Sequence, residues 1–270
     1  MSTRLQIAHA GAVFAADTAG EGTPVLFLHA NVCDSRMWRE QVDAVGEAFH
    51  AIAYDRRGFG QTRAVPEDHS NVSDLFAVLD AVAPDRQAVL VGCSAGGRIV
   101  IDAALRHPER VSALVLVSPG VAGAPAPAYP AAALPLLANL QQAEARGDID
   151  KINTIKARLW LDGPLQPEGR IGGTTRSLFL DMNQRVLLAP PTGTDLDMDR
   201  AWPRLAEISV PTLLLWGEYD FPHIQERCRR MVQSLPAVQG HALRGVAHLP
   251  SLEQPGEVNA LILDFLSSVG

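Results

Sequence analysis

The chain has 270 residues, 47% hydrophobic and 20% charged, a balance typical of globular proteins that excludes disordered, collagen-like and coiled-coil chains. Its 23 Lys and Arg residues against 30 Asp and Glu residues leave a net charge of −7, and no basic cluster offers a face for nucleic acid. Cys33, Cys93 and Cys228 are odd in number and widely spaced, so neither a disulfide framework nor a zinc site is predicted.

No membrane or export signal is predicted either. The N-terminal residues lack the apolar stretch of a signal peptide. Residues 111–143 carry no charge, but prolines interrupt them repeatedly, and lipid does not tolerate a broken helix without cover from protein. We therefore expect a soluble cytoplasmic protein with no membrane partner, and the sequence leaves its oligomeric state open.

In the first part of the chain, short apolar runs alternate with helical stripes of apolar residues. This alternation predicts a mostly parallel sheet with helices on both faces. Weaker alternation before Pro24, with turn glycines, indicates an antiparallel hairpin at the sheet edge. The runs predict buried strands at 24–28, 51–54, 88–91 and 113–117, and the stripes predict helices over 38–49, 75–82 and 95–107.

The pattern changes between residues 120 and 205, where no apolar strand run occurs. This stretch has prolines, turn pairs and helix-like segments over 134–156 and 174–188. The strand pattern resumes at 211–216, and two helical stripes, 224–235 and 258–269, close the chain. We therefore expect one core built from 1–119 and 206–270, with 120–205 inserted as a helical lid.

The strand at 88–91 leads into Gly92-Cys93-Ser94-Ala95-Gly96, a G-x-S-x-G pattern followed by a predicted helix. In this strand–turn–helix context the pattern is typical of a nucleophilic serine held on a sharp turn between small residues. Cys93 is the alternative nucleophile, but the glycines centre on Ser94, so we interpret Cys93 as a buried structural residue.

A serine nucleophile needs a base, and the base needs a carboxylate to orient it. His248 lies in a loop before the last helix, where an open α/β sheet carries its site. Asp220 follows the strand at 211–216, and Glu218 is a competing acid two residues nearer that strand. The chain order Ser94, Asp220, His248 is the order expected for such a sheet.

Acyl transfer also requires donors for a developing oxyanion. The backbone N–H of Ala95, directly after the serine, is one candidate. The second is expected from the loop after strand 24–28, where the N–H of Asn31 is preferred and His29 is a candidate contact for the substrate. The alternative is that His29 and Asn31 only shape the loop.

Five segments in order resemble the successive motifs of the α/β-hydrolase superfamily, in particular the group with 3-oxoadipate enol-lactonases and small carboxylesterases. The resemblance implies a sheet of about eight strands, a helical lid after the sixth strand, and the roles of nucleophile, acid and base for Ser94, Asp220 and His248. One departure is Ala30, where the family usually has glycine. The segments are 28–31, 55–62, 92–97, 217–220 and 245–250.

We therefore predict a serine esterase or lactonase that acts on a small molecule and needs no cofactor or metal, since no metal motif or dinucleotide loop is present. Carbon–carbon hydrolases and perhydrolases share the triad and remain open, whereas dehalogenases and epoxide hydrolases require an aspartate at position 94. An α/β-hydrolase-like receptor that binds a small molecule without turnover is the non-enzymatic alternative.

Apolar lid residues are candidates to line a pocket over Ser94, although packing of the lid on itself explains them equally well. A substrate with a carboxylate would also require an arginine, for which Arg158, Arg176 and Arg185 are candidates. The apolar candidates are Tyr129, Leu137 and Trp160, together with Leu134, Phe179 and Met182.

Overall fold

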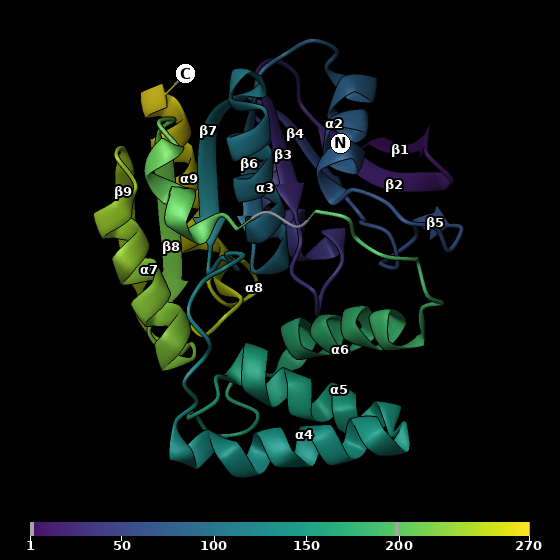
Figure 1. Ribbon diagram of the computed structural model, residues 1–270, viewed down its shortest axis with the longest axis vertical. Helices are drawn as coiled ribbons and strands as arrows, with labels where there is room; N and C mark the ends of the chain where they lie inside the picture. The colour runs from purple at the N-terminus through teal and green to yellow at the C-terminus, as the bar shows by residue number, and fades with distance from the viewer. Residues whose placement is uncertain (1–2, 198–199, 270) are drawn as a thin grey trace.

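A central sheet organises the protein in the computed structural model, which describes residues 3–197 and 200–269 (Figure 1). Its strands are β1 (Thr3–His9), β2 (Ala12–Ala19), β3 (Pro24–Leu28), β4 (His50–Tyr54), β5 (Arg63–Ala64), β6 (Ala88–Cys93), β7 (Val111–Val117), β8 (Thr212–Gly217) and β9 (Val238–Leu243). Eight follow the order β1-β2-β4-β3-β6-β7-β8-β9, and the short β5 pairs with β2. The predicted α/β-hydrolase sheet of about eight strands is confirmed.

Six neighbouring strands run parallel to one another, namely β4, β3, β6, β7, β8 and β9, whereas β1 and β2 form an antiparallel hairpin at one edge. This edge hairpin is the one expected before Pro24. Central strands are buried on both faces, as in β3, where all five residues are buried. Because side chains alternate, Leu26 and Leu28 join one apolar cluster, while Val25 and Phe27 join the other.

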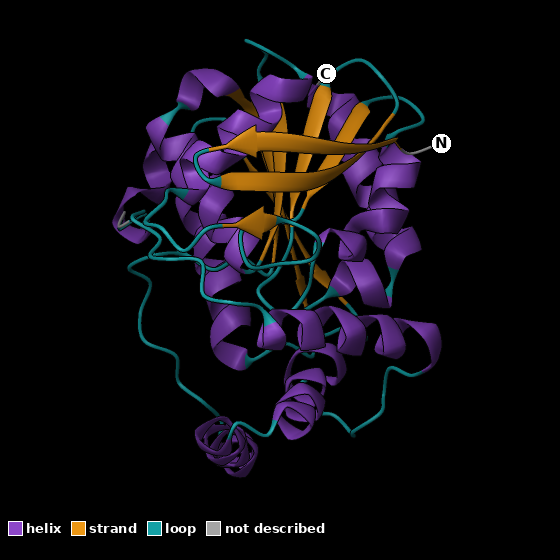
Figure 2. Ribbon diagram, turned by 90° about the vertical axis from the view of Figure 1, so that its right-hand side faces the viewer, coloured by secondary structure: helices purple, strands orange, loops and turns teal. Residues whose placement is uncertain are grey.

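Helices cover both faces of the sheet (Figure 2). Apolar residues of α2 (Asn71–Val82), α3 (Ala95–Arg106) and α7 (Pro222–Ser234) fill the first cluster. Those of α1 (Arg39–Val45) and α9 (Pro255–Val269) fill the second cluster, on the opposite face. These helices match the stripes seen in the sequence, because a stripe of apolar residues is buried only when it faces the sheet.

The segment between β7 and β8 carries a separate group of helices beyond the carboxyl ends of the parallel strands (Figures 1 and 2). They are α4 (Leu134–Arg146), α5 (Ile149–Ala157), a π turn η4 (Arg158–Asp162) and α6 (Gly173–Leu188). The helix-like stretch 134–156 is therefore two helices. Gly147, with φ 65°, ends α4, and the Asp148 side chain accepts the N–H of Lys151 to start α5.

After α6 the chain returns to the core. The Asp197 carboxylate accepts the backbone N–H of Val72 at 2.9 Å and the hydroxyl of Ser70 at 2.7 Å, both at the start of α2. Asp195 pairs with Arg98 of α3 at 2.5 Å. Because this return segment is held by the core, we propose that the lid itself is the helical part, 134–188, within the expected insertion of 120–205.

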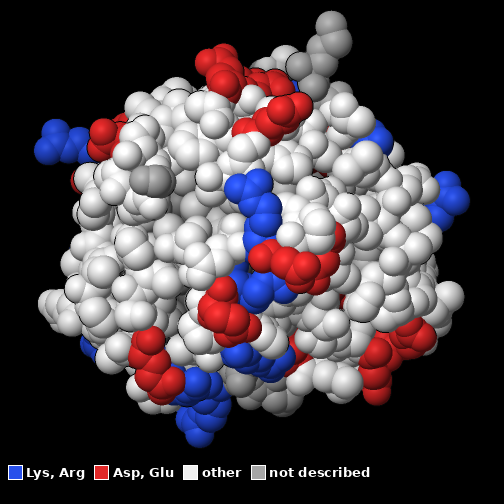
Figure 3. All heavy atoms as spheres, turned by 90° about the horizontal axis from the view of Figure 1, so that it is seen from above, with Lys and Arg blue, Asp and Glu red and all other residues white. Residues whose placement is uncertain are grey.

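The face of the molecule opposite the lid helices is drawn in Figure 3. Basic side chains near its centre are bordered by acidic ones, so this face has no continuous basic patch. In the part of the chain that the structure describes, no helix is long and apolar enough to cross a bilayer.

Candidate active site

Ser94 occupies the sharp turn between β6 and α3. Its φ of 53° and ψ of −113° lie in a region that residues other than glycine rarely adopt. The turn is held on two sides, since the Ser94 N–H donates to the Val117 carbonyl at 3.0 Å and the Gly120 N–H donates to the Ser94 carbonyl at 2.8 Å. Ser94 is only half-buried, so the turn presents its side chain at the carboxyl edge of the sheet.

The small residues around Ser94 are required by close packing. A Cβ atom on Gly96 would lie 2.3 Å from the Leu28 carbonyl oxygen, at the place where α3 meets β3. Ala95 is the first residue of α3, so its N–H is one of the four that have no partner within the helix. An anion beside Ser94 would therefore meet an available donor at a positive helix end.

Asp220 and His248 come together from the ends of β8 and β9. The carboxylate is only an acceptor, so His248 Nδ1–H donates to Asp220 Oδ2, at 2.7 Å, and in the neutral imidazole Nε2 is then the acceptor nitrogen. Asp220 Oδ1 also accepts the N–H of Phe221 at 2.7 Å, which fixes the carboxylate. The competing acid, Glu218, is exposed. The structure thus brings Asp220, rather than Glu218, to the histidine.

The loop after β3, which carries His29, Ala30 and Asn31, is held by Arg56. The Arg56 guanidinium donates to the Asn31 side-chain oxygen at 2.9 Å and to the His29 carbonyl at 3.2 Å. It also lies 4.4 Å from the centre of the Phe59 ring. Burial lowers the pKa of Arg56 to about 10, which still leaves it charged at neutral pH.

His29 does not have the role that the sequence suggested. Its ring is fully buried, Nδ1–H donates to the Ala30 carbonyl at 2.9 Å, and Nε2 accepts the Arg56 N–H at 3.1 Å. Both nitrogens are engaged by the protein, so the expectation that His29 contacts substrate is wrong and the side chain instead shapes the loop. Burial, with the Arg56 charge, lowers its pKa well below the ordinary value.

Ala30 fits the loop after β3, although the α/β-hydrolases that the sequence resembles usually have glycine at this position. Among the described residues, those other than glycine with positive φ are Ala10, Asp85, Ser94 and Ser118, so Ala30 is not strained in this way. Its N–H points to the sulfur of Met37 at 3.4 Å. The Ala30 N–H is therefore already bound within the protein, which supports the choice of Asn31 as the donor.

Comparison with known proteins identifies the family. A sequence model described as the alpha/beta hydrolase family matches residues 25–261. The chain belongs to this family. It is 27% identical to a 2-hydroxy-6-oxo-6-phenylhexa-2,4-dienoate hydrolase of Burkholderia cepacia, over 93% of this chain and 90% of that protein. It is 29% identical to the carboxylesterase YbfK of Bacillus subtilis, over 90% and 79% of the two chains.

Among solved structures, a thermophilic esterase from Thermogutta terrifontis is similar along the whole chain. The TM-score is 0.79 with 25% sequence identity, and the match covers 99% of both chains. This α/β-hydrolase is thus similar in sequence to a carboxylesterase and to a dienoate hydrolase. It is similar in fold to the thermophilic esterase.

In this hydrolase, lid and core meet in an aromatic cluster over His248. The Trp160 ring, from η4, lies 4.6 Å from the His248 ring and 5.2 Å from the Phe221 ring. Tyr129 packs edge-on against Phe221 at 5.5 Å and is 43% exposed. Leu137 lies on α4, half-buried against apolar neighbours, so the structure places it in the packing of the lid.

Other lid residues singled out in the sequence have packing roles or paired charges. Phe179 and Met182 are fully buried, whereas Leu134 is 51% exposed. All three candidate arginines face carboxylates: Arg158 pairs with Glu168, Arg176 with Asp162 and Arg185 with Asp181.

Cys93 is fully buried beside the nucleophile turn, with its Sγ 3.9 Å from the His248 carbonyl oxygen. Burial raises the pKa of its thiol far above neutral pH, so the reactive thiolate does not form there. Within residues 3–197 and 200–269, no group of His, Cys, Asp and Glu side chains is arranged to hold a metal ion.

Sequence reasoning missed four residues around the site. Phe221 directly follows Asp220 and has no pattern of its own. Arg56 lies in the motif segment 55–62, but the motif gave no role to its side chain. Glu253 accepts backbone N–H groups of the loop that carries His248, and Arg170 donates to the Gly245 carbonyl at the start of that loop. Glu253 could have been noticed from the sequence, because it lies five residues after His248, at the end of a short helical turn, and can therefore reach back to the histidine loop.

Proposed function

We propose that this hydrolase cleaves a small carboxylic ester or lactone, with Ser94 as nucleophile, His248 as general base and Asp220 as the acid that orients the base. The 2.7 Å bond between His248 and Asp220 carries this proposal. It sets the histidine tautomer that a serine nucleophile requires. Ser94 is held on a strained turn, and its neighbour in the sequence, Cys93, has its Sγ 3.9 Å from the His248 carbonyl oxygen.

The proposed reaction has two halves. Nε2 of His248 takes the proton of Ser94 Oγ, and Oγ attacks the carbonyl carbon of the substrate to form a tetrahedral oxyanion near the N–H groups of Ala95 and Asn31. Collapse of this intermediate breaks the bond to the leaving alkoxide, which receives the proton from Nε2. Water then attacks the acyl-enzyme by the same proton route and releases the acid.

The lid favours an uncharged acyl group. Aromatic rings of Trp160, Phe221 and Tyr129 gather near His248. The lid arginines that a substrate carboxylate would need are already paired with acids of the protein, and a paired cation gains little from a second carboxylate.

A second candidate is hydrolysis of a carbon–carbon bond on the same triad. The 27% identity to the dienoate hydrolase of Burkholderia cepacia favours it. Because a dienoate carries a carboxylate, the paired lid arginines make this candidate the weaker of the two.

The first test is turnover of a panel of p-nitrophenyl esters, lactones and a 2-hydroxy-6-oxodienoate. We expect ester or lactone turnover that falls roughly 10⁴- to 10⁶-fold in Ser94→Ala. Cys93→Ala is the control and should keep both turnover and labelling of the enzyme by a fluorophosphonate. Undiminished ester hydrolysis in Ser94→Ala would refute the role of the serine, and a wild-type protein that resists labelling would point to a receptor.

A further inference from the structure

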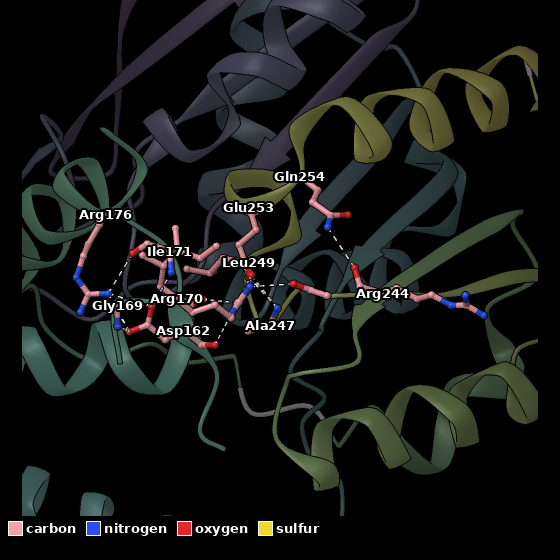
Figure 4. Close-up of polar contacts among 12 residues, drawn as sticks. Asp162, Gly169, Arg170, Ile171, Arg176, Arg244, Ala247, Leu249, Glu253 and Gln254 are labelled. Atoms are coloured by element: carbon pink, nitrogen blue, oxygen red, sulfur yellow. Dashed lines mark hydrogen bonds and ion pairs between the residues drawn. The ribbon is translucent and has the colours of Figure 1, made fainter. Parts of the chain in front are cut away.

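A buried carboxylate outside the triad binds the backbone on both sides of His248. The Glu253 side chain, at the end of α8 (Pro250–Glu253), is fully buried. Its oxygens accept the N–H of Ala247 at 3.0 and 2.9 Å and the N–H of Leu249 at 3.3 Å. Since these residues flank His248, one side chain fixes the peptide segment that carries the imidazole (Figure 4).

The lid binds the same carboxylate. Arg170, in the loop between η4 and α6, forms an ion pair with Glu253 and donates to the Gly245 carbonyl at 2.8 Å. The backbone around Arg170 is held in the same way as the backbone around His248, by one carboxylate that binds the residues on both sides. The Asp162 carboxylate accepts the N–H of Gly169 at 2.9 Å and the N–H of Ile171 at 3.1 Å. The guanidinium is thus presented to Glu253 from a fixed backbone.

Arg170 also holds the part of the lid that covers the histidine. Its guanidinium donates to the carbonyls of Leu161 at 2.8 Å and Asp162 at 2.6 Å, the last residues of η4. The same turn carries Trp160, whose ring lies 4.6 Å from that of His248. The Arg170 side chain therefore joins the loop that carries His248 to the turn that carries Trp160.

We propose that Arg170 and Glu253 are positioning residues for His248, and that their ion pair makes the placement of the imidazole depend on seating of the lid. The proposal rests on the proposed function in treating His248 as the base. A base must lie within hydrogen-bond reach of the hydroxyl, and a loop can drift out of reach unless its backbone is held.

The test compares Glu253→Gln, Arg170→Met and the double variant. We expect each single variant to lower kcat for a p-nitrophenyl ester by up to about 10²-fold with little change in KM, because misplacement of the base slows chemistry more than binding. The loss in the double variant should be smaller than the product of the two single losses, since both substitutions break the ion pair that the two residues share. The downfield NMR signal of His248 Nδ1–H should shift or broaden in all three.

Asp74→Asn is the matched control. It breaks another buried ion pair, with Arg57 at 2.7 Å, on α2 and away from the His248 loop. We expect its melting temperature to fall while kcat and the His248 signal stay as in the wild type.

The proposal is overturned if Arg170→Met and Glu253→Gln, measured below their melting temperatures, keep wild-type kcat and an unchanged His248 signal. If Glu253→Gln does not fold, the less buried Arg170→Met decides alone. Absence of Ser94-dependent turnover in the wild type would refute the proposed function instead, and the His248 signal would still report whether the ion pair positions the ring.

Discussion

His29 and His248 are both buried in loops at the carboxyl edge of the sheet, but their ring nitrogens face different partners. In His29, one nitrogen donates to a carbonyl and the other accepts a backbone N–H. In His248, Nδ1 is bound to Asp220, and Nε2 stays available for proton transfer. The chemistry that we propose for His248 therefore follows from its hydrogen-bond partners rather than from its residue type.

Substitution of Asp220 tests this argument. In Asp220→Asn the side-chain amide no longer requires Nδ1 to carry the proton, so the imidazole can adopt the tautomer that blocks Nε2. We expect kcat for an ester to fall about 10⁴-fold while the fold remains. Glu218→Gln, at the exposed neighbouring acid, should keep wild-type kcat; a comparable loss in both variants would contradict the assignment of Asp220.

At the scale of elements, the end of β8 and the His248 loop approach each other very closely. A Cβ atom on Gly217 would lie 2.0 Å from the Ala247 carbonyl oxygen. The glycine therefore lets the Asp220 and His248 loops meet, although neither loop shows this contact in its own sequence.

Gly217→Ala should force these two loops apart. We expect a loss of about 1–3 kcal/mol in the free energy of unfolding, because an added methyl has no room beside a backbone carbonyl, together with a fall in kcat. Urea unfolding and ester turnover measure the two effects. Gly256→Ala is the matched control, since its added methyl meets no atom within 4 Å and alanine favours the helix α9. Equal stability of Gly217→Ala and wild type would contradict the close approach.

For the molecule as a whole, buried histidines make stability depend on pH. Burial, with the charge of Arg56, lowers the pKa of His29 well below its ordinary value of 6.5, and burial also lowers the pKa of His50 and of His223. At these three histidines, the unfolded chain thus binds more protons than the native protein below about pH 6.5. The contribution of His29 to stability is complete above that pH and is lost as the pH falls.

We expect the free energy of unfolding to decrease between about pH 7 and pH 5, with His29 contributing up to about 1.4 kcal/mol per pH unit. Burial raises the pKa of Asp55 and of Glu253, which opposes this trend, so the comparison must be between variants. In urea unfolding, His29→Gln should show a smaller slope of the unfolding free energy against pH than the wild type. An unchanged slope in His29→Gln would contradict the prediction, because it would mean that His29 binds protons equally in the native and unfolded states.

Much of the fold could be predicted because its elements carry their own periodicity. Apolar runs such as 24–28 are buried wherever the sheet forms, and the matching strand β3 has the predicted bounds. The G-x-S-x-G turn was also readable, since close packing at Gly96 leaves a short list of permitted residues. Gly147 divides the stretch 134–156 into two helices. A glycine is a local signal for a helix end, but the helical spacing of apolar residues on both sides of it suggested one continuous helix.

The sequence by itself determined the α/β-hydrolase fold and the candidates Ser94, Asp220 and His248, because strand runs, helical stripes and glycine turns act over a few neighbouring residues. Only the tertiary structure decided that Asp220 rather than Glu218 meets His248, that His29 is closed to substrate, and that Arg170 reaches Glu253. Arg170 and Glu253 are 83 positions apart. Such contacts depend on how loops pack across the sheet edge, and no pattern of neighbouring residues indicates which distant residue a side chain will meet.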